Sequence, residues 1–535
     1  MSRDPRAFVA LDRGTATVAA SLVARIDGRW RLLGATAAPA AVGTDAVIER
    51  LRRRLAASES ELADLLGVAS PGSAADLPRV ECGTSRPPEI AVIAATDRVL
   101  APLVAVAATA GWRVRPLVLD GAEILPVATA LADPRVAAVL AGASDPPGAD
   151  ERGLLGDLGA VIAAAADRRP DLVVILAGGL AAPRSRVEAQ LRPGRPGPTV
   201  LAPSPLRDGG DPLHEILDGL CGAGHDGRRA LATGAATLAE VLRRRIEVVE
   251  VGQSGATRIV AGFTAGRTLP TRRASVPAAA LLPPGFSDTH LDAVAGWLTT
   301  PLDRLRLRDR LRELALAPWG DATGEGALLR LAAARAALER LRAATPAMDE
   351  GPAPDVVIAS GGAWAIAPGP AIGLALADVM RRPGVRALGW DHARLLAPLG
   401  AIEDEGERRA VVADLRDDLL LPLGSVVMPA GLRAGKMAGH LSVRGEGGPA
   451  ELDLVPGGLE LVDLPPGERA VIELRFKDPV DLGTRLKHAA VEVTGGLGGL
   501  LIDLRDVPLR LPDRPERRRD LLAAWQAALW AGMEA

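Results

Sequence analysis

The sequence predicts an α/β protein built from two similar halves and followed by a small β-rich segment. Three observations lead to this prediction. Apolar β runs alternate with amphipathic helices through most of the chain, which is typical of layered α/β folds. A strand–acid–glycine–loop–strand pattern occurs twice, near Phe8 and near Glu247. From about Leu421 onward, short strands separated by Gly and Pro turns replace the alternation.

Length and composition indicate an ordinary globular protein of several domains. The chain has 535 residues, more than one hydrophobic core usually serves. Hydrophobic residues make up 48% and charged residues 24%, so burial can offset the entropy of the chain. The net charge is −3 and the arginines are interspersed with acids, which argues against a nucleic-acid interface. Aromatic residues make up only 2%, so sites that stack bases on rings are not expected.

Cysteine usage and hydropathy predict a cytoplasmic protein. Two cysteines, Cys82 and Cys221, are too few for a disulfide framework and fit a reducing compartment. No long apolar segment follows the first residues, so no signal peptide is expected. The most apolar stretch, Ile90–Trp112, is interrupted by Asp97 and Arg98 and reads as a strand followed by a helix. We therefore expect no membrane-spanning segment.

The first copy of the repeated pattern is a β-meander. Apolar runs at Phe8–Asp12, Val18–Ala24 and Trp30–Gly34 are joined by short polar turns. An amphipathic helix is expected to begin near Thr44. The acid of this copy, Asp12, stands at the end of the first strand and just before the first turn.

The second copy has the same order of residue types. Glu247–Gly252 is an apolar strand with an acid, Glu250, two positions before a glycine. The loop Gln253–Thr257 is rich in small and hydroxyl residues, and Ile259–Gly262 is a second apolar strand. The two copies lie about 240 residues apart, which predicts a duplicated domain.

A third element points to the class of fold. The apolar strand Val356–Ala359 ends in the turn Ser360-Gly361-Gly362. Two acidic hairpin loops and one Gly-Gly strand end are the parts from which actin-like ATPases assemble a nucleotide site. The sequence therefore predicts a duplicated actin-like (ribonuclease H-like) ATPase fold with an appended small β-rich domain. We expect lobes at 1–240 and 241–420, the β-rich domain at 421–514 and a C-terminal helix at 515–535.

The pattern also predicts a role for each site residue. Glycine lets a backbone approach phosphate closely, and threonine adds a hydroxyl donor. Asp12 is expected to hold Mg²⁺ through its water shell, with Glu250 as the second catalytic acid. Catalysis would consist of electrostatic stabilisation and the positioning of a water molecule. The residues expected to bind ATP are Gly14, Thr15 and Thr17 in the first loop, Gly252 and Thr257 in the second, and Ser360, Gly361 and Gly362 beneath the adenosine.

Taken singly, each of these motifs also fits an ordinary turn. The segment Gly389–His392 is interpreted as a strand-to-helix turn. The six histidines are scattered without metal-ligand spacing, so no zinc site is expected.

Several segments resemble the glutamate mutase L family, the accessory proteins of cobalamin-dependent methylaspartate mutase. The matching segments are FVALDRGTATVAASLVARIDGRWRLLGATAAPA, PDLVVILAGG, VVEVGQSGATRIVAGF, PDVVIASGGAWAIAP, LLPLGSVVMPAG, LELVDLPPGERAVIELR and VTGGLGGLLIDLRDVPLRLP. The resemblance covers nearly the whole chain. It implies an actin-like fold, ATP and Mg²⁺ as cofactors, and a chaperone-like role as a reactivating factor for a cobalamin-dependent mutase.

The chain departs from the family pattern in the second loop. The family commonly has Asp where Glu250 stands, and a Gly/Ala-Thr-Thr loop in place of Gln253–Thr257. This departure bears on hydrolysis more than on nucleotide binding, so a weak ATPase and a non-hydrolysing scaffold both stay open. A small-molecule kinase of the same superfamily is disfavoured, because no loop offers a clear Asp to deprotonate a substrate hydroxyl. A homodimer is also left open.

Overall fold

The computed structural model describes residues 7–56, 77–119, 124–181, 197–222, 226–264, 266–283, 285–317, 324–365, 367–433, 435–445 and 448–530. The chain divides into two compact units. Unit 1 comprises residues 1–85, 225–273 and 279–535, and unit 2 comprises residues 86–224 and 274–278.

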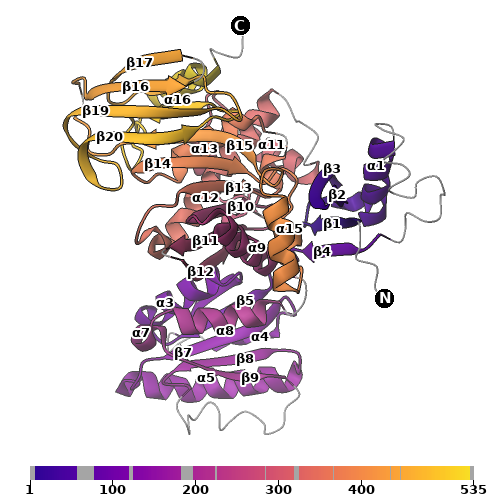
Figure 1. Ribbon diagram of the computed structural model, residues 1–535. Helices are drawn as coiled ribbons and strands as arrows, with labels where there is room; N and C mark the ends of the chain where they lie inside the picture. Colours follow the sequence, from indigo (N-terminus) through magenta and orange to yellow (C-terminus); the bar gives the residue numbers. More distant parts are fainter. Residues whose placement is uncertain are drawn as a thin grey trace. The chain divides into compact units, whose positions relative to one another are not determined.

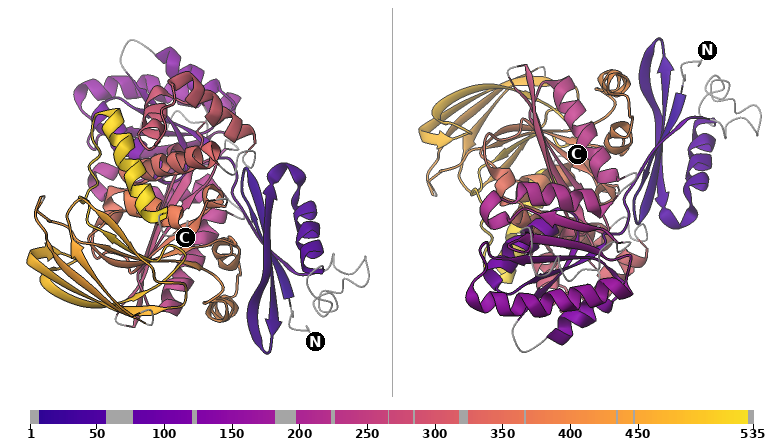
Figure 2. Two further views of the ribbon diagram at one scale, coloured as in Figure 1. Left: turned by 90° about the horizontal axis from the view of Figure 1, so that it is seen from above. Right: turned by 90° about the horizontal axis from the view of Figure 1, so that it is seen from below.

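Unit 1 opens with a four-stranded sheet in the order β3-β2-β1-β4. Its strands are β1 (Ala7–Arg13), β2 (Thr17–Ile26), β3 (Arg29–Pro39) and β4 (Arg79–Gly83). The first three strands form an antiparallel meander, and β4 lies parallel to β1. Helix α1 (Thr44–Ala56) begins where the sequence predicts and lies along one face of the sheet (Figure 2). Its apolar side chains, Val47, Ile48 and Leu51, are buried against that face.

A second sheet of unit 1 repeats this order in its first strands. It runs β12-β11-β10-β13-β14-β15-β21-β18 (Figure 1). The strands of the repeat are β10 (Ile246–Val251), β11 (Ala256–Thr264), β12 (Arg267–Val276), β13 (Val356–Ser360) and β14 (Gly384–Trp390). Here β10 pairs antiparallel with β11 and parallel with β13, as β1 does with β2 and β4. The predicted duplication is thus confirmed, and the fold is the duplicated actin-like one.

One hydrophobic core joins the two repeats. It contains Phe8 and Cys82 of the first repeat together with Ile246 and Ile358 of the second. Helix α9 (Gly227–Leu242) also contributes to this core and packs against α14 (Leu396–Gly400). The two repeats are therefore one packed body within unit 1.

Further helices of unit 1 pack around the second repeat. They are α10 (Asp288–Ala295), α11 (Arg304–Leu316), α12 (Glu325–Ala344), α13 (Gly369–Val379) and α15 (Glu405–Asp414). Helix α12 is buried over most of its length, because small alanines allow close packing with its neighbours.

Unit 2 is a doubly wound domain. Its parallel sheet has the order β6-β5-β7-β8-β9, with helices on both faces (Figure 1). The strands are β5 (Glu89–Ala94), β6 (Arg113–Val118), β7 (Val136–Ala143), β8 (Val173–Gly178) and β9 (Thr199–Ala202). The helices are α3 (Asp97–Thr109), α4 (Ile124–Ala132), α5 (Ala149–Arg168), α7 (Pro205–Asp208) and α8 (Asp211–Cys221). The strand β5 is buried throughout, which explains why it reads as a continuous apolar run.

This arrangement differs from the expected division of the chain. Residues 86–224, which the sequence analysis places inside a first lobe at 1–240, form a compact unit of their own. The expected boundaries at 240 and 420 stay predictions.

The β-rich segment near the C-terminus contributes to two sheets. Strands β16 (Gly439–Gly445), β17 (Gly448–Leu454), β19 (Arg469–Asp481) and β20 (Arg485–Thr494) form a sheet in the order β17-β16-β19-β20. The remaining strands, β15 (Leu421–Met428), β18 (Leu459–Val462) and β21 (Leu500–Asp503), extend the sheet of the second repeat. They do so because β15 pairs antiparallel with β14, and Ser425–Val427 then pairs in parallel with Leu500–Ile502 of β21. Helix α16 (Pro515–Trp530) follows.

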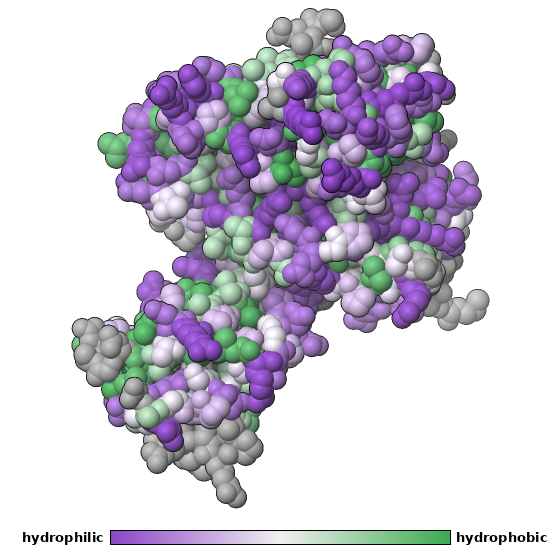
Figure 3. Space-filling view, turned by 90° about the vertical axis from the view of Figure 1, so that its left-hand side faces the viewer, coloured by the Kyte–Doolittle hydropathy of each residue, from purple (hydrophilic) through white to green (hydrophobic). Residues whose placement is uncertain are grey.

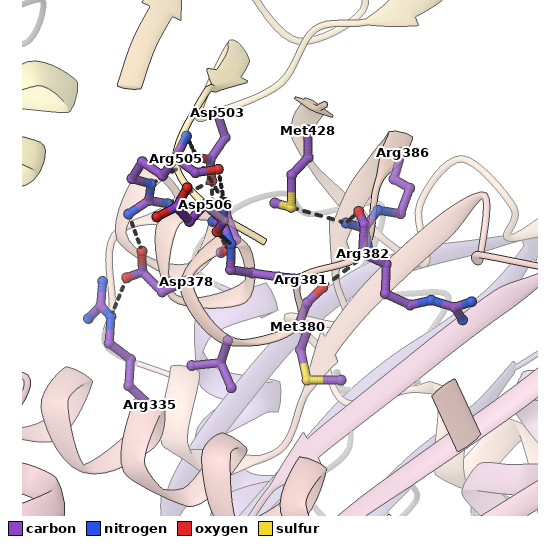
Figure 4. A network of polar contacts seen from close by, with 12 residues as sticks. Arg335, Asp378, Met380, Arg381, Arg382, Arg386, Met428, Asp503, Arg505 and Asp506 are labelled. Atoms are coloured by element: carbon purple, nitrogen blue, oxygen red, sulfur yellow. Dashed lines mark hydrogen bonds and ion pairs between the residues drawn. The ribbon is translucent and has the colours of Figure 1, made fainter. Parts of the chain in front are cut away.

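A buried ionic network fastens this segment to the second repeat (Figure 4). Asp378 of α13 accepts from Arg335 at 2.6 Å and from Arg505 at 2.7 Å. Asp503 accepts from Arg381 at 2.5 Å and from Arg505 at 2.7 Å. All five side chains are almost fully buried, so each charge depends on its partners in the network.

The surface is mainly polar on the face drawn in Figure 3, where hydrophobic side chains occur in small scattered groups. In the part of the chain that the structure describes, no helix is both long and apolar enough to cross a bilayer.

Helix α10 carries a buried histidine, His290, whose ring stacks on Phe286 with a centroid distance of 5.6 Å. The Arg340 guanidinium lies 2.9 Å from its Nδ1. Because arginine can only donate, Nδ1 accepts and the ring is neutral with its proton on Nε2. Burial and the positive charge of Arg340 lower the pKa of His290 to about 4.

This histidine makes unit 1 less stable in mild acid. The unfolded chain binds a proton at His290 from about pH 6.5, whereas the folded protein resists it down to about pH 4. The contribution of neutral His290 to the free energy of unfolding is complete above pH 6.5. It is lost as the pH falls toward 4, which lowers that free energy by on the order of 3 kcal/mol. Urea melts of the wild type and of His290→Gln between pH 7.5 and 4.5 measure it. The wild type should lose more stability than the variant over this range, and parallel curves would contradict the assignment.

Candidate functional site

The ends of the two hairpins have the same local geometry. Gly14 N–H donates to the Thr17 carbonyl at 2.9 Å, and Gly252 N–H donates to the Gly255 carbonyl at 2.9 Å. In both copies the acid stands two positions before the glycine, which places Asp12 and Glu250 at equivalent points. The two loops also meet, because the Thr15 hydroxyl donates to Ser254 Oγ at 3.2 Å.

The strands parallel to the hairpins extend the equivalence. Asp12 lies opposite Cys82 in the register of β1 and β4, and Glu250 lies opposite Ser360 in that of β10 and β13. Each partner is followed by a glycine. Gly361 has a φ of +95°, and a Cβ there would come within 2.6 Å of the Val251 carbonyl oxygen. This tight approach explains why the turn needs glycine.

Arg394 enters this site from the turn between β14 and α14. Its Nε lies 3.2 Å from Asp12 Oδ2, and its Nη2 donates to the Asp12 carbonyl at 3.2 Å. Its Nη1 donates to the Thr17 hydroxyl at 2.6 Å. The Arg394 side chain is only 7% exposed, so its ion pair with Asp12 is largely buried.

Two more acids face the site and hold their protons unusually well. Burial and the neighbouring charge of Asp12 raise the pKa of Glu250 to about 7, although the Thr257 hydroxyl bonds to it. Burial raises the pKa of Asp391 to about 6, against hydrogen bonds from Leu395 N–H at 2.8 Å and Ser360 Oγ at 3.0 Å.

Cys82 lies beside Asp12 on the neighbouring strand. Its Sγ lies 3.9 Å from Asp12 Oδ1 and the side chain is fully buried. Burial, then the charge of Asp12, raises the pKa of this thiol well above its usual range. Cys82 is therefore a neutral thiol rather than a reactive thiolate.

The space left between these groups is small. A cavity of about 20 Å³ is lined by Asp12, Thr84, Gly227, Arg228, Leu231, Glu250, Ser360, Gly361, Asp391, Arg394 and Ala397. That volume holds about one water molecule. Sites for ligands of nucleotide size usually measure hundreds of Å³.

The structure brings most of the predicted site residues together. Asp12, Glu250, Ser360 and Gly361 line the cavity. Thr17 contacts Arg394, Thr257 contacts Glu250, and Thr15 contacts the opposite loop. Gly14 and Gly252 close their hairpins, and Gly362 lies so near the first hairpin that a Cβ on it would be 3.2 Å from Thr17 Oγ1. The roles assigned to these residues toward phosphate, adenosine and Mg²⁺ stay predictions.

The residues present do not fit Mg²⁺ and ATP in this arrangement. Magnesium requires a carboxylate and several retained waters at about 2 Å. Here one Asp12 oxygen faces the Arg394 guanidinium at 3.2 Å, and the cavity leaves no room for a hydrated ion. Within the described ranges, no group of three or more His, Cys, Asp or Glu is placed to hold a metal ion.

Arg394, Arg228, Asp391 and Cys82 were not assigned to the site from the sequence, in which the segment that contains Asp391 is interpreted as a turn. Asp391 was visible as an acid directly after an apolar strand, the same signal that identified Asp12. Cys82 could be found only by aligning β4 with β13. Arg394 has no sequence signal, because its partner Asp12 lies 382 positions away.

Comparisons with known proteins find solved structures that are similar to the chain at low identity. No protein-family model matches the chain, and no curated protein matches its sequence. A nucleotide-free structure of acetone carboxylase is similar at 14% identity over 83% of this chain and 80% of that chain, with a TM-score of 0.32. The ethanolamine utilization protein EutJ from Carboxydothermus hydrogenoformans is similar at 13% identity over 77% and 91%, with a TM-score of 0.26. A reductive activator for a corrinoid, iron-sulfur protein is similar at 12% identity over 78% and 63%, with a TM-score of 0.23. The fold class rests on the duplicated sheet topology of unit 1, which defines an actin-like protein.

Proposed function

We propose that this chain is an actin-like accessory protein that acts on a partner enzyme by binding it, without turning over a nucleotide. The observation that carries the proposal is the closed site between the two repeats. The loops touch through Thr15 and Ser254, and the acids enclose about 20 Å³. In this state the cavity between the acids is too small for a nucleotide, whereas the surface of the protein stays available to a partner.

The partner follows from the resemblance to the glutamate mutase L family. That resemblance implies a cobalamin-dependent mutase as the enzyme that the chain assists. The departures at Glu250 and Gln253–Thr257 agree with a scaffold rather than a motor, because they alter the second loop on which hydrolysis would depend.

A second candidate is an ATP-binding reactivating factor. The specific observation in its favour is the survival of both hairpins with their acids, glycines and hydroxyls in equivalent positions. Binding would then require Arg394 to leave Asp12 and the two loops to separate. No such rearrangement is needed for the scaffold.

Phosphate release from ATP separates the two candidates. We expect the purified full chain to release phosphate at the rate of the buffer, with Asp12→Ala indistinguishable from the wild type. In parallel, sedimentation velocity with a purified cobalamin-dependent methylaspartate mutase should show a complex in the absence of ATP. Turnover that Asp12→Ala abolishes would overturn the scaffold proposal and favour the reactivating factor.

A further inference from the structure

We propose that Arg394 is a resident cation, whose guanidinium stands in the place of a divalent metal at Asp12 and latches the two repeats together. The inference rests on the proposed function in one respect, because it takes the closed site as the working state.

The latch spans the two repeats. Arg394 follows β14 of the second repeat, and each of its three guanidinium nitrogens faces an oxygen of the first. Nε faces Asp12 Oδ2 at 3.2 Å, Nη1 donates to the Thr17 hydroxyl at 2.6 Å, and Nη2 donates to the Asp12 carbonyl at 3.2 Å. Nη1 and Nη2 make hydrogen bonds, whereas Nε makes only an ion pair with the carboxylate. A planar guanidinium suits such a divided set of oxygens, whereas a single point charge does not.

The charge of Asp12 favours a cation at this point. Its carboxylate borders the small cavity and is only 17% exposed, and a carboxylate in such a place is stabilised by a paired cation. Arg394 supplies that charge permanently, since a guanidinium does not lose its proton in proteins. A divalent ion at the same Asp12 oxygen would be repelled by the guanidinium and would have to displace it.

The backbone around Arg394 is shaped to aim its side chain. Arg394 has a φ of +52°, a left-handed conformation that is uncommon for a residue other than glycine. Its N–H donates to the Asp391 carbonyl at 3.2 Å, and Asp391 in turn accepts from Leu395 N–H. The turn is thus held on both sides of the arginine.

Two glycines border the guanidinium. A Cβ on Gly362 would lie 3.6 Å from Arg394 Nη1 and one on Gly14 would lie 4.0 Å from it, which are ordinary van der Waals distances. The small residues that an actin-like site offers to a nucleotide therefore border an arginine of the chain itself. Because the guanidinium is part of the chain, it occupies this place without the entropic cost of binding a free ion.

The test is to remove the guanidinium and look for the metal site that it replaces. Full-length Arg394→Ala, Arg394→Lys and the wild type are titrated with Mn²⁺, followed by electron paramagnetic resonance, and their melting temperatures are measured with and without about 10 mM Mg²⁺. Arg394→Ala should bind Mn²⁺ at least tenfold more tightly than the wild type and should melt higher in Mg²⁺. Arg394→Lys keeps a positive charge beside Asp12 and should gain no site.

Two further variants control the result. The double variant Arg394→Ala/Asp12→Asn should lose the new site, because the metal would have no carboxylate. Arg408→Ala removes an arginine that donates to the Thr237 hydroxyl and to the Ile402 carbonyl, so it should gain no metal affinity.

Each possible result for Arg394→Ala either supports or overturns the inference. Should Arg394→Ala fold only in the presence of Mg²⁺, the metal replaces the guanidinium and the inference is supported. A folded Arg394→Ala without a metal site, a variant that stays unfolded in Mg²⁺, or a wild type that binds Mn²⁺ equally well would overturn it. Phosphate release by the wild type would instead overturn the proposed function, so the two failures are distinguishable.

Discussion

Asp503→Ala is expected to lower the free energy of unfolding of unit 1 by about 3–5 kcal/mol. Asp503 and Arg381 are both fully buried, and the carboxylate accepts from Arg381 and from Arg505 (Figure 4). These two arginines hold the pKa of Asp503 below its ordinary value in spite of burial. Without the carboxylate, the guanidinium of Arg381 keeps only carbonyl acceptors in an interior that solvates a cation poorly.

The measurement is the midpoint of urea denaturation, followed by circular dichroism. Asp478→Ala is the matched control, because Asp478 makes an exposed ion pair with Arg433 at 3.5 Å. That substitution should change stability by no more than about 0.5 kcal/mol. Equal effects of the two substitutions would show that the network is not the fastening between the second repeat and the C-terminal strands.

Gly400→Ala is expected to cost about 3 kcal/mol or more, or to prevent folding of unit 1. A Cβ on Gly400 would lie 1.8 Å from the Ala230 carbonyl oxygen of α9, and a Cβ on Gly234 would lie 2.0 Å from the Leu396 carbonyl oxygen of α14. Both obstacles are backbone atoms, so no side chain can rotate away. The two helices must separate, and they carry part of the core that both repeats share.

Thermal melting of the soluble variant measures this effect. Gly219→Ala is the control, since Gly219 lies exposed on α8 and a Cβ there meets nothing within 4 Å. Alanine should be neutral or slightly stabilising at that helical position. A melting temperature of Gly400→Ala close to that of the wild type would contradict the close crossing of α9 and α14.

The sequence predicts those parts of the fold that depend on local pattern. The hairpins at Asp12 and Glu250 are visible because strand, acid, glycine and loop follow one another within a few residues. The same holds for Ser360-Gly361-Gly362, where the strand ends at the turn. Their equivalent hydrogen bonds, from Gly14 and Gly252, confirm that similar residues in similar order form similar structures.

Pairings between distant segments could not be predicted in this way. An apolar strand such as β5 carries no mark of its neighbours, so its place in the sheet of unit 2 was not expected. Likewise β15 carries no mark of its partners, yet it pairs with β14 and β21 in the sheet of the second repeat. The site shows the same limit, because the pair of Asp12 and Arg394 exists only once both repeats have folded against each other.

We propose that Arg394 and the two hairpins close the site without a nucleotide. Calorimetric titration of the wild-type chain with Mg-ATP, with Asp12→Ala as the companion protein, measures whether the site admits one. We expect no saturable heat up to about 1 mM ATP for either protein, an affinity weaker than about −4 kcal/mol. Saturable binding by the wild type that weakens tenfold or more in Asp12→Ala would show that a nucleotide displaces Arg394, and would contradict the claim.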